Sequence, residues 1–191
     1  MTTTLPIRDS GQVRQLAAYF LEIGQLRNHA LIVLCVNTAL RICDLLRLTW
    51  DDVYDFENCR FRQSISVSEK KTGKTKILTL NKRAIEALTA YQVDAVEGGV
   101  IFISRNGFNK AISRQQAYRI IKAGAEALAF AFRVSCHSLR KTFGYLAFKA
   151  GVPAVVIMKV YNHSSLAITL RYIGITQDDI DHCYHKLAEL T

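Results

Sequence analysis

The spacing of apolar residues changes twice along this chain, and no other feature of the sequence constrains the fold so strongly. Apolar residues recur at helical intervals over residues 13–23 and 28–40, and again from residue 82 to the C-terminus. Between residues 53 and 80 they are spaced as in strands, and polar turns at 55–58 and 71–74 interrupt them. This pattern predicts a mainly α-helical fold with one small antiparallel β-sheet of two or three strands, an α+β architecture.

The ends of several expected helices carry recognisable signals. Asn81 is a good N-cap for a helix that begins at residue 82, and Ser113 with Gln116 forms a capping box for another. Gly151 is expected to stop a helix, and Pro153 fits the first turn of the next one. We expect helices over residues 13–23, 28–40, 42–48, 82–93, 114–129, 138–149, 153–161, 166–173 and 180–190.

Basic residues are concentrated in two blocks of the chain. The 191 residues carry 25 Lys and Arg against 16 Asp and Glu, a formal net charge of +9. Residues 60–83 hold eight Lys and Arg and one acid, and residues 103–149 hold nine and one. Two such blocks on an otherwise mildly acidic chain favour a polyanionic partner, of which nucleic acid is the commonest. The alternative interpretation is an enzyme with a merely basic surface.

Length, hydropathy and cysteine spacing disfavour several other classes of protein. A chain of 191 residues has the length of one domain. Its longest apolar run, Ala30–Val36, is far shorter than the roughly 20 residues of a membrane span, and its N-terminus lacks a signal-peptide pattern. The five cysteines are scattered without a CxxC pair, which predicts reduced thiols and no zinc site. We expect a soluble cytoplasmic protein with no metal and no cofactor, in which His182, Cys183 and His185 form one face of an amphipathic helix.

The side chains with the most chemical potential gather in the last third of the chain. His137-Ser-Leu-Arg140 places two polar side chains on one helix face, because residues i and i+3 are neighbours there. Asn162-His163-Ser-Ser follows, and Tyr172 comes nine residues after His163. By this spacing His137 and Arg140 can approach one ligand together.

Two motifs further upstream complete the pattern. Arg41 begins a segment that continues Ile-Cys-Asp44-Leu-Leu-Arg-Leu-Thr-Trp, and Lys71-Thr-Gly-Lys74 lies at the tip of the expected hairpin. In this order the motifs resemble those of the tyrosine recombinases, also called the phage integrase family. Each motif alone is common, but together they extend from Arg41 to Tyr172, about 70% of the chain.

The resemblance implies the catalytic-domain fold of that family and a nucleophile for DNA cleavage. Tyr172 matches the family tyrosine that forms a 3′-phosphotyrosine and releases a 5′-hydroxyl. A phenolate can attack phosphorus and later leave again, so the energy of the phosphodiester is conserved. Arg41 and Arg140 match two arginines whose forked guanidinium groups hold the phosphate and stabilise the charge of its transition state.

Three further residues match groups that handle protons. Lys71 matches the general acid that protonates the leaving 5′-oxygen, and His137 matches a proton-handling residue that also helps to hold the phosphate. His163 matches the second histidine, which donates to a non-bridging oxygen. The family chemistry implies neither metal nor ATP, in agreement with the missing GxxxxGK[ST] phosphate-binding loop.

Some assignments have competitors within the sequence. Lys70 and Lys74 lie close to Lys71, so the register of the general acid is a choice. Tyr161 and Tyr184 compete as nucleophile, although neither has the required spacing. Further DNA-contacting side chains are expected in the basic blocks and after them: Lys70, Lys74, Lys76, Arg105, Lys110, Arg114, Lys141 and Arg171. For the last five of these, a solvated basic surface without a DNA contact is the equal alternative.

Two positions depart from the family pattern. Asp44 stands where glutamate is more usual, and an ordinary Arg41–Asp44 ion pair is the structural alternative to a catalytic Arg41. Asn162 replaces a glycine ahead of His163. Because asparagine tolerates a left-handed backbone better than most residues, we expect this turn to survive.

The length implies a catalytic domain standing alone, similar in size to the short fimbrial-switch recombinases. Residues 1–174 are expected to form the core and residues 175–191 a C-terminal helix that neighbouring subunits exchange. We therefore expect the chain to lack the N-terminal core-binding domain of larger relatives. The implied partners are double-stranded DNA, three further copies in a tetramer on DNA assembled from monomers, and an accessory DNA-bending protein or a partner recombinase.

The sequence therefore predicts a site-specific DNA recombinase encoded by a prokaryote, a phage or another mobile element and associated with the nucleoid when it acts. A non-enzymatic DNA-binding regulator and a type IB topoisomerase-like enzyme are the alternatives. The DNA site, and the choice among integration, excision, inversion and resolution, depend on base contacts that a single chain does not reveal.

Overall fold

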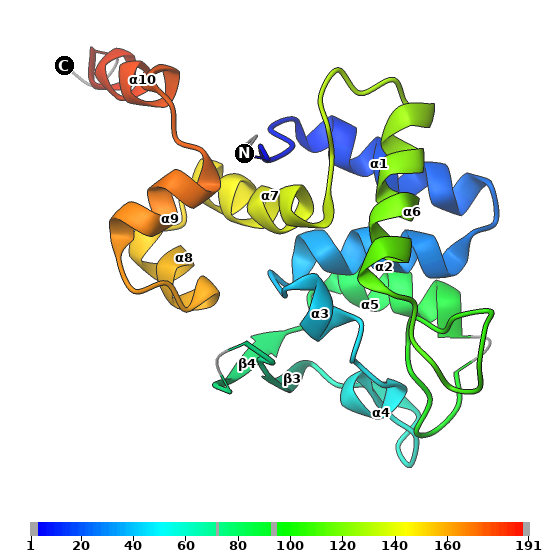
Figure 1. The fold of residues 1–191 in the computed structure, drawn as a ribbon. Helices are drawn as coiled ribbons and strands as arrows, with labels where there is room; N and C mark the ends of the chain where they lie inside the picture. Colours follow the sequence, from blue (N-terminus) through cyan, green and yellow to red (C-terminus); the bar gives the residue numbers. More distant parts are fainter. Residues whose placement is uncertain (1–3, 72, 93–94, 189–191) are drawn as a thin grey trace.

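The computed structural model describes residues 4–71, 73–92 and 95–188, and for residues 178, 180, 182 and 183 it describes the backbone only. Helices dominate, and they pack around a central helix, α2 (Leu26–Asn37) (Figure 1). The apolar run from Ala30 to Val36 forms most of α2, which is buried because α1 (Ser10–Glu22), α5 (Lys82–Tyr91) and α7 (Cys136–Lys149) surround it. Within the described residues, no helix has the length and hydropathy needed to cross a membrane.

The strand-like region forms two hairpins, in contrast to the single sheet that its pattern predicts. β1 (Tyr54–Asp55) pairs with β2 (Arg60–Phe61), and β3 (Ser64–Ser68) pairs with β4 (Thr75–Thr79), both antiparallel. The prediction of one continuous sheet is wrong because each hairpin closes on its own turn. The prediction of antiparallel strands ending in a lysine-rich turn is confirmed.

The expected helix over residues 42–48 is also shorter than predicted. Helix α3 (Ile42–Leu45) ends early because the Leu48 carbonyl accepts a hydrogen bond from the Ile101 backbone, 3.0 Å away. A new short helix, α4 (Trp50–Val53), then begins where the Thr49 backbone and hydroxyl both donate to the Asp52 carboxylate, at 2.8 and 3.0 Å. The local helical pattern is therefore overridden by a contact with a distant segment.

Helix caps appear where the sequence indicates them. The Asn81 side chain accepts from the Ala84 backbone at the start of α5, and Ser113 accepts from Gln116 at the start of α6 (Arg114–Ala127). Helix α7 begins two residues earlier than expected, because Ser135 caps it through a reciprocal pair of bonds with Ser138. This earlier start places His137 in the first turn of α7.

The last helices form a separate small cluster against the end of α7. Helices α8 (Ala154–Tyr161) and α9 (Leu166–Ile173) pack on each other and on α7, with Tyr161 and Ile173 buried between them. Helix α10 (Gln177–Ala188) begins earlier than the expected 180 and extends away from the other helices (Figure 1). The expected ends at residues 93 and 190 lie outside the described residues, as do the side chains of His182 and Cys183.

Candidate active site

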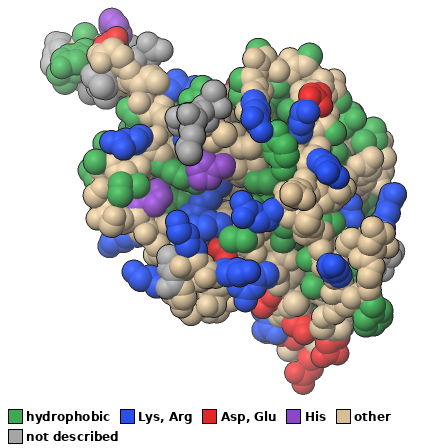
Figure 2. All heavy atoms as spheres, viewed as in Figure 1, with side chains coloured by type: hydrophobic (Ala, Val, Ile, Leu, Met, Phe, Trp, Pro, Cys, Tyr) green, Lys and Arg blue, Asp and Glu red, His purple; other side chains and the backbone are tan. Residues whose placement is uncertain are grey.

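A cleft of about 1510 Å³ lies between the main body and the α8–α9 cluster. Its walls come from the start of α3, the β3–β4 turn, the first turns of α6 and α7, and the α8–α9 segment. Lys and Arg side chains surround this hollow, whereas most of the acidic side chains visible on the same face gather at the lower edge of the molecule, away from the hollow (Figure 2). The cleft brings together all the residues that the family resemblance singles out: Arg41, Lys71, His137, Arg140, His163 and Tyr172.

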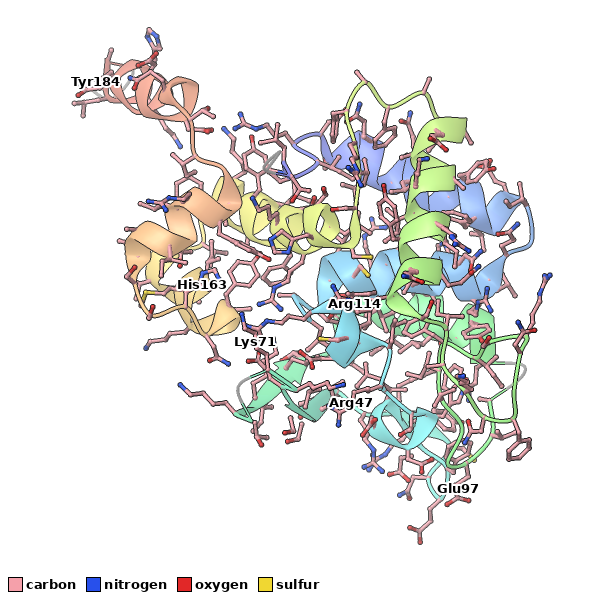
Figure 3. All side chains as sticks on the ribbon, viewed as in Figure 1. Arg47, Lys71, Glu97, Arg114, His163 and Tyr184 are labelled. Atoms are coloured by element: carbon pink, nitrogen blue, oxygen red, sulfur yellow. The ribbon has the colours of Figure 1, made fainter. Side chains whose placement is uncertain are left out.

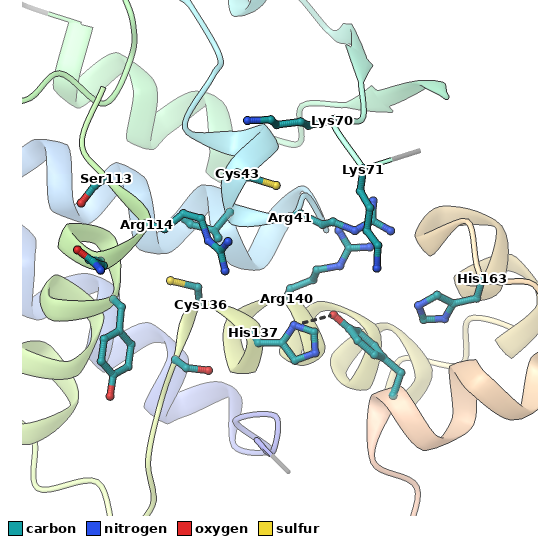
Figure 4. Close-up of a pocket in the computed structure, with 15 residues that line it drawn as sticks. Arg41, Cys43, Lys70, Lys71, Ser113, Arg114, Cys136, His137, Arg140 and His163 are labelled. Atoms are coloured by element: carbon teal, nitrogen blue, oxygen red, sulfur yellow. Dashed lines mark hydrogen bonds between the residues drawn. The ribbon is translucent and has the colours of Figure 1, made fainter. Parts of the chain in front are cut away.

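Tyr172 and His137 face each other across this cleft. The phenol oxygen of Tyr172, on α9, lies 3.4 Å from Nδ1 of His137, on α7 (Figure 4). Burial, together with the positive charges of Lys141 and Arg140, lowers the pKa of His137 to about 4. The imidazole is therefore neutral near pH 7 and has a lone pair with which it can accept the phenol proton.

His163 occupies the other side of Tyr172. The centroids of the two rings are 4.9 Å apart, and Nδ1 of His163 lies 3.1 Å from the Thr169 hydroxyl. The Thr169 hydroxyl also lies 3.3 Å from the Ser165 carbonyl oxygen, so the imidazole is held against the first turn of α9. Burial lowers the pKa of His163, with further lowering by Arg140 and Arg41.

The backbone ahead of His163 has the left-handed conformation that its sequence suggests. Asn162 ends α8 with φ 56° and ψ 38°. The expectation that asparagine preserves this turn is confirmed. The turn brings His163 back toward the cleft instead of continuing α8.

Arg140 is the most deeply buried cation of the cleft. It is 4% exposed, and its guanidinium carbon lies 5.0 Å from the centroid of the Tyr161 ring. Among the described residues, its Nη1 has no hydrogen-bond partner. A buried donor without a partner is costly, so the cleft presents a guanidinium that is poised for an anion.

Burial raises the pKa of Tyr172, whereas Arg140 and Arg41 lower it. In water-excluded surroundings the neutral phenol is favoured, and the two guanidinium groups offset part of that effect. A phosphate held by the arginines would stand beside the same oxygen. The phenol therefore needs a proton acceptor at the moment of attack.

Arg41 pairs with a different acid from the one suggested by its sequence neighbourhood. Its Nη1 lies 2.7 Å from Oε2 of Glu69, whereas Asp44 accepts a hydrogen bond from the Lys70 backbone at 2.9 Å. Nothing in the sequence distinguished Glu69 beyond its being the single acid of the first basic block. Its pairing with Arg41 therefore escaped sequence reasoning.

The two candidate lysines of the turn differ in direction. Lys70 and Lys71 both line the cleft, but Lys71 extends toward Arg41 and Arg140 while Lys70 points away from both arginines (Figure 4). Lys74 is exposed and does not line the cleft. Lys71, Arg114 and His163 approach the centre from three different elements, whereas Tyr184 lies far away on α10 (Figure 3).

The other expected DNA contacts are distributed unevenly. Arg114 lines the cleft, and Arg171 is exposed on α9. Arg105 and Lys110 line a second groove of about 980 Å³, which shares Ser113 with the first. The two grooves thus adjoin at the start of α6.

Two lysines expected on the DNA-facing surface turn inward. Lys141 is 5% exposed, donates to the Thr4 carbonyl at 2.8 Å, and lies 5.3 Å from the Tyr172 ring centroid. Lys76 is half-buried and donates to the Val160 carbonyl at 3.4 Å, and burial lowers its pKa to about 8. Lys141 is thus little exposed in this structure, and its ammonium group is engaged by the Thr4 carbonyl beside the Tyr172 ring.

Known proteins with similar sequences are integrases and recombinases. The chain matches the phage integrase family over residues 9–178. It is 32% identical to the probable integrase/recombinase YoeC of Bacillus subtilis (strain 168) over 185 residues, 97% of each chain. It is 33% identical to the type 1 fimbriae regulatory protein FimE of Escherichia coli (strain K12) over 153 residues, 76% of this chain and 73% of FimE.

Solved structures share the fold at lower sequence identity. The crystal structure of XerA recombinase matches with a TM-score of 0.77 at 19% identity, covering 97% of this chain and 66% of that one. The chain spans about half the length of the XerC and XerD recombinases it matches. The fold is that of a tyrosine recombinase catalytic domain, and the chain belongs to the phage integrase family. Site-specific DNA recombination is the activity that these relatives support, and nothing in them favours the two alternatives.

Proposed function

We propose that this chain cuts and rejoins DNA through a covalent bond between Tyr172 and a 3′-phosphate. The phenol oxygen attacks the scissile phosphorus, the bond from phosphorus to the 5′-oxygen breaks, and a 5′-hydroxyl leaves. The reverse attack by a 5′-hydroxyl of another strand reseals the DNA and frees Tyr172. No phosphodiester energy is lost, so the reaction requires no ATP and, in this proposal, no metal.

The observation that carries the proposal is the 3.4 Å approach of the Tyr172 oxygen to Nδ1 of His137 inside a cleft lined by arginines. His137 takes the phenol proton as general base, since its lowered pKa keeps it neutral. Lys71 gives a proton to the leaving 5′-oxygen as general acid. In this assignment His137 removes the proton from the attacking phenol oxygen, and Lys71 supplies the proton to the leaving 5′-oxygen.

The remaining side chains hold the phosphate. Arg41 and Arg140 bind the non-bridging oxygens. His163 donates to one of them from Nε2, in the tautomer whose Nδ1 accepts from the Thr169 hydroxyl. Negative charge increases on these oxygens in the transition state, so the donors act most strongly there. The unpartnered Nη1 of Arg140 among the described residues supports this assignment.

Double-stranded DNA would lie across the cleft and the adjoining groove. We assign Lys70, Lys74, Arg105, Arg114 and Arg171 to phosphate contacts. Lys76 instead holds the β3–β4 hairpin against α8 through the Val160 carbonyl. A chain that contacts DNA through one domain should bind with strong salt dependence. An accessory DNA-bending protein or a partner recombinase would strengthen that binding.

Strand exchange between two duplexes implies a tetramer assembled from monomers. Helix α10 extends away from the core and exposes Tyr184 and Leu187, at 72% and 60%. We assign α10 to exchange between neighbouring subunits. The setting in this proposal is the cytoplasm of a prokaryote, with the gene carried by a phage or another mobile element.

A nicked duplex library tests the covalent step for any DNA site. Each duplex carries a randomised core and a nick close to the cleavage position. Cleavage then releases a short fragment that bears the 5′-hydroxyl, and its loss by diffusion prevents religation and traps the adduct. Wild-type protein is expected to form denaturant-resistant adducts that share a sequence, and Tyr172→Phe is expected to form none. Absence of adducts from the wild type, or their persistence in Tyr172→Phe, would sink the proposal. Relaxation of plasmids without sequence preference would instead favour the topoisomerase-like alternative.

A further inference from the structure

Glu69 lies at the base of the turn that carries Lys71. Its backbone N–H donates to the Lys74 carbonyl at 3.0 Å, and its own carbonyl accepts from the Gly73 backbone at 2.8 Å. These two bonds close the turn immediately after β3. The backbone of Glu69 thus determines where the turn begins.

The Glu69 side chain points into the protein, away from the surface of the hairpin. Its residue is 0% exposed, and Oε2 lies 2.7 Å from Nη1 of Arg41. A fully buried carboxylate is costly unless a charged partner offsets the loss of hydration. Arg41 retains 25% side-chain exposure at the cleft, so one part of its guanidinium contacts Glu69 while another part stays open to a ligand.

A second acid fastens the same turn to the same helix. Asp44 is 1% exposed, and Oδ1 accepts the Lys70 backbone N–H at 2.9 Å. The turn is therefore held to the start of α3 at two points, once through Asp44 and once through the Glu69–Arg41 pair. Of the side chains that make these two attachments, that of Arg41 lines the cleft.

We propose that Glu69 is a positioning residue that fixes the guanidinium of Arg41 and the turn of Lys71 relative to each other. This inference rests on the proposed function, in which Arg41 holds the phosphate and Lys71 protonates the leaving oxygen. One residue orients both, through its carboxylate for Arg41 and through its backbone for the turn of Lys71. A displacement of about 1 Å between such groups costs about 10²-fold in rate.

The negative charge of Glu69 gives this role a distinctive signature. Glu69 competes with a DNA phosphate for Arg41, so its neutralisation leaves the cleft more positive. Glu69→Gln keeps the size of the side chain and removes the charge. Binding of DNA is then expected to stay equal or become tighter, while covalent cleavage becomes slower. A residue that served the fold alone would weaken both together.

The test compares Glu69→Gln with Glu86→Gln on the nicked duplex that the wild type selects. Glu86 is exposed on α5 and pairs with Lys82 at 3.9 Å, so the control removes the same charge from a surface ion pair. At saturating DNA, Glu69→Gln is expected to form adducts about 10²-fold more slowly than wild type, with undiminished affinity. Glu86→Gln is expected to match wild type in both measurements.

A wild-type rate for Glu69→Gln, or an equal loss of rate and affinity, overturns the inference. If Glu69→Gln does not fold, Glu69→Asp keeps the charge but withdraws the carboxylate by one methylene. That variant is expected to fold and to cleave slowly, and a wild-type rate for it overturns the inference as well. Failure of the wild type to form any adduct would instead refute the proposed function itself.

Discussion

The hydroxyl of Tyr161 donates a 2.7 Å hydrogen bond to the backbone carbonyl of Arg140 and so joins α8 to α7. The ring of Tyr161 is fully buried, and the rings of His163 and Tyr172 each have their centroid 5.0 Å from it. The Arg140 guanidinium lies over the same ring. Tyr161 therefore packs against three residues of the cleft, Arg140, His163 and Tyr172, while its hydroxyl is hydrogen-bonded to a backbone carbonyl.

Replacement of Tyr161 by phenylalanine is expected to weaken the fold and to preserve the chemistry. The variant removes one hydrogen bond from the Arg140 carbonyl, which keeps its intrahelical bond in α7, so the free energy of unfolding should fall by about 0.5–1.5 kcal/mol. Adduct formation should persist at temperatures where the variant is folded, because Tyr172 remains. Denaturant unfolding and the nicked-duplex assay measure the two effects. Tyr184→Phe, at an exposed position, is the control and should change neither the free energy of unfolding nor the rate of adduct formation. Loss of adducts in folded Tyr161→Phe would contradict the assignment of Tyr172 as the nucleophile.

A methyl group at Gly144 is expected to separate α9 from α7. A Cβ there would lie 2.6 Å from Ile173 Cγ2 and 2.7 Å from Tyr161 Cε2, with the Tyr161 hydroxyl closer still. Gly144→Ala should lower the free energy of unfolding by about 1–3 kcal/mol, because a tightly packed core must shift. Tyr172 is carried by α9, so adduct formation should slow as well. An unchanged unfolding midpoint would show that the helices do not approach so closely.

Replacement of His137 by glutamine is expected to slow adduct formation by about 10²–10⁴-fold, the usual contribution of a general base. The same variant should also change how stability depends on pH. Burial lowers the pKa of His137 to about 4 in the folded protein, below the value of about 6.5 for an unfolded chain. Between these values the unfolded state binds the extra proton, so the wild type gains stability as pH rises from about 4 to 6.5.

That gain should be smaller in His137→Gln, and urea titrations across this pH range measure it. His29→Gln is a suitable control, since His29 hydrogen-bonds the Ala17 carbonyl and does not line the cleft. It should leave the rate of adduct formation unchanged. An equal rate for His137→Gln and the wild type would remove His137 from the mechanism.

Replacement of Lys71 by alanine is expected to slow cleavage by about 10²–10⁴-fold, because the leaving 5′-oxygen then departs without a proton. A substrate with sulfur at that bridging position supplies a leaving group that needs no protonation. The rate of Lys71→Ala should recover on the sulfur substrate, whereas that of His137→Gln should not. Lys82→Ala, on the surface of α5, should behave as wild type on both. No recovery for Lys71→Ala would assign the acid to another group, with Lys70 the next candidate.

Much of this protein is determined locally and was accessible from the sequence. The helical periodicity predicted the mainly α-helical fold, and the capping residues Asn81 and Ser113 marked the helix starts. The i, i+3 spacing of His137 and Arg140 predicted that both reach one cleft, as they do. Asn162 adopts the left-handed conformation inferred for it. These features depend on residues within one turn of each other, so sequence spacing is sufficient to determine them.

The tertiary structure alone decided which partners meet across long separations. Arg41 pairs with Glu69 and not with Asp44, Lys141 turns inward to Thr4, and the strand region closes as two hairpins. Each outcome depends on how desolvation and packing balance between segments that are distant along the chain, and no local pattern encodes that balance. The motifs in the sequence predicted which residues line the cleft. The packing of α3, α7 and α9 determined which atoms of those residues face each other.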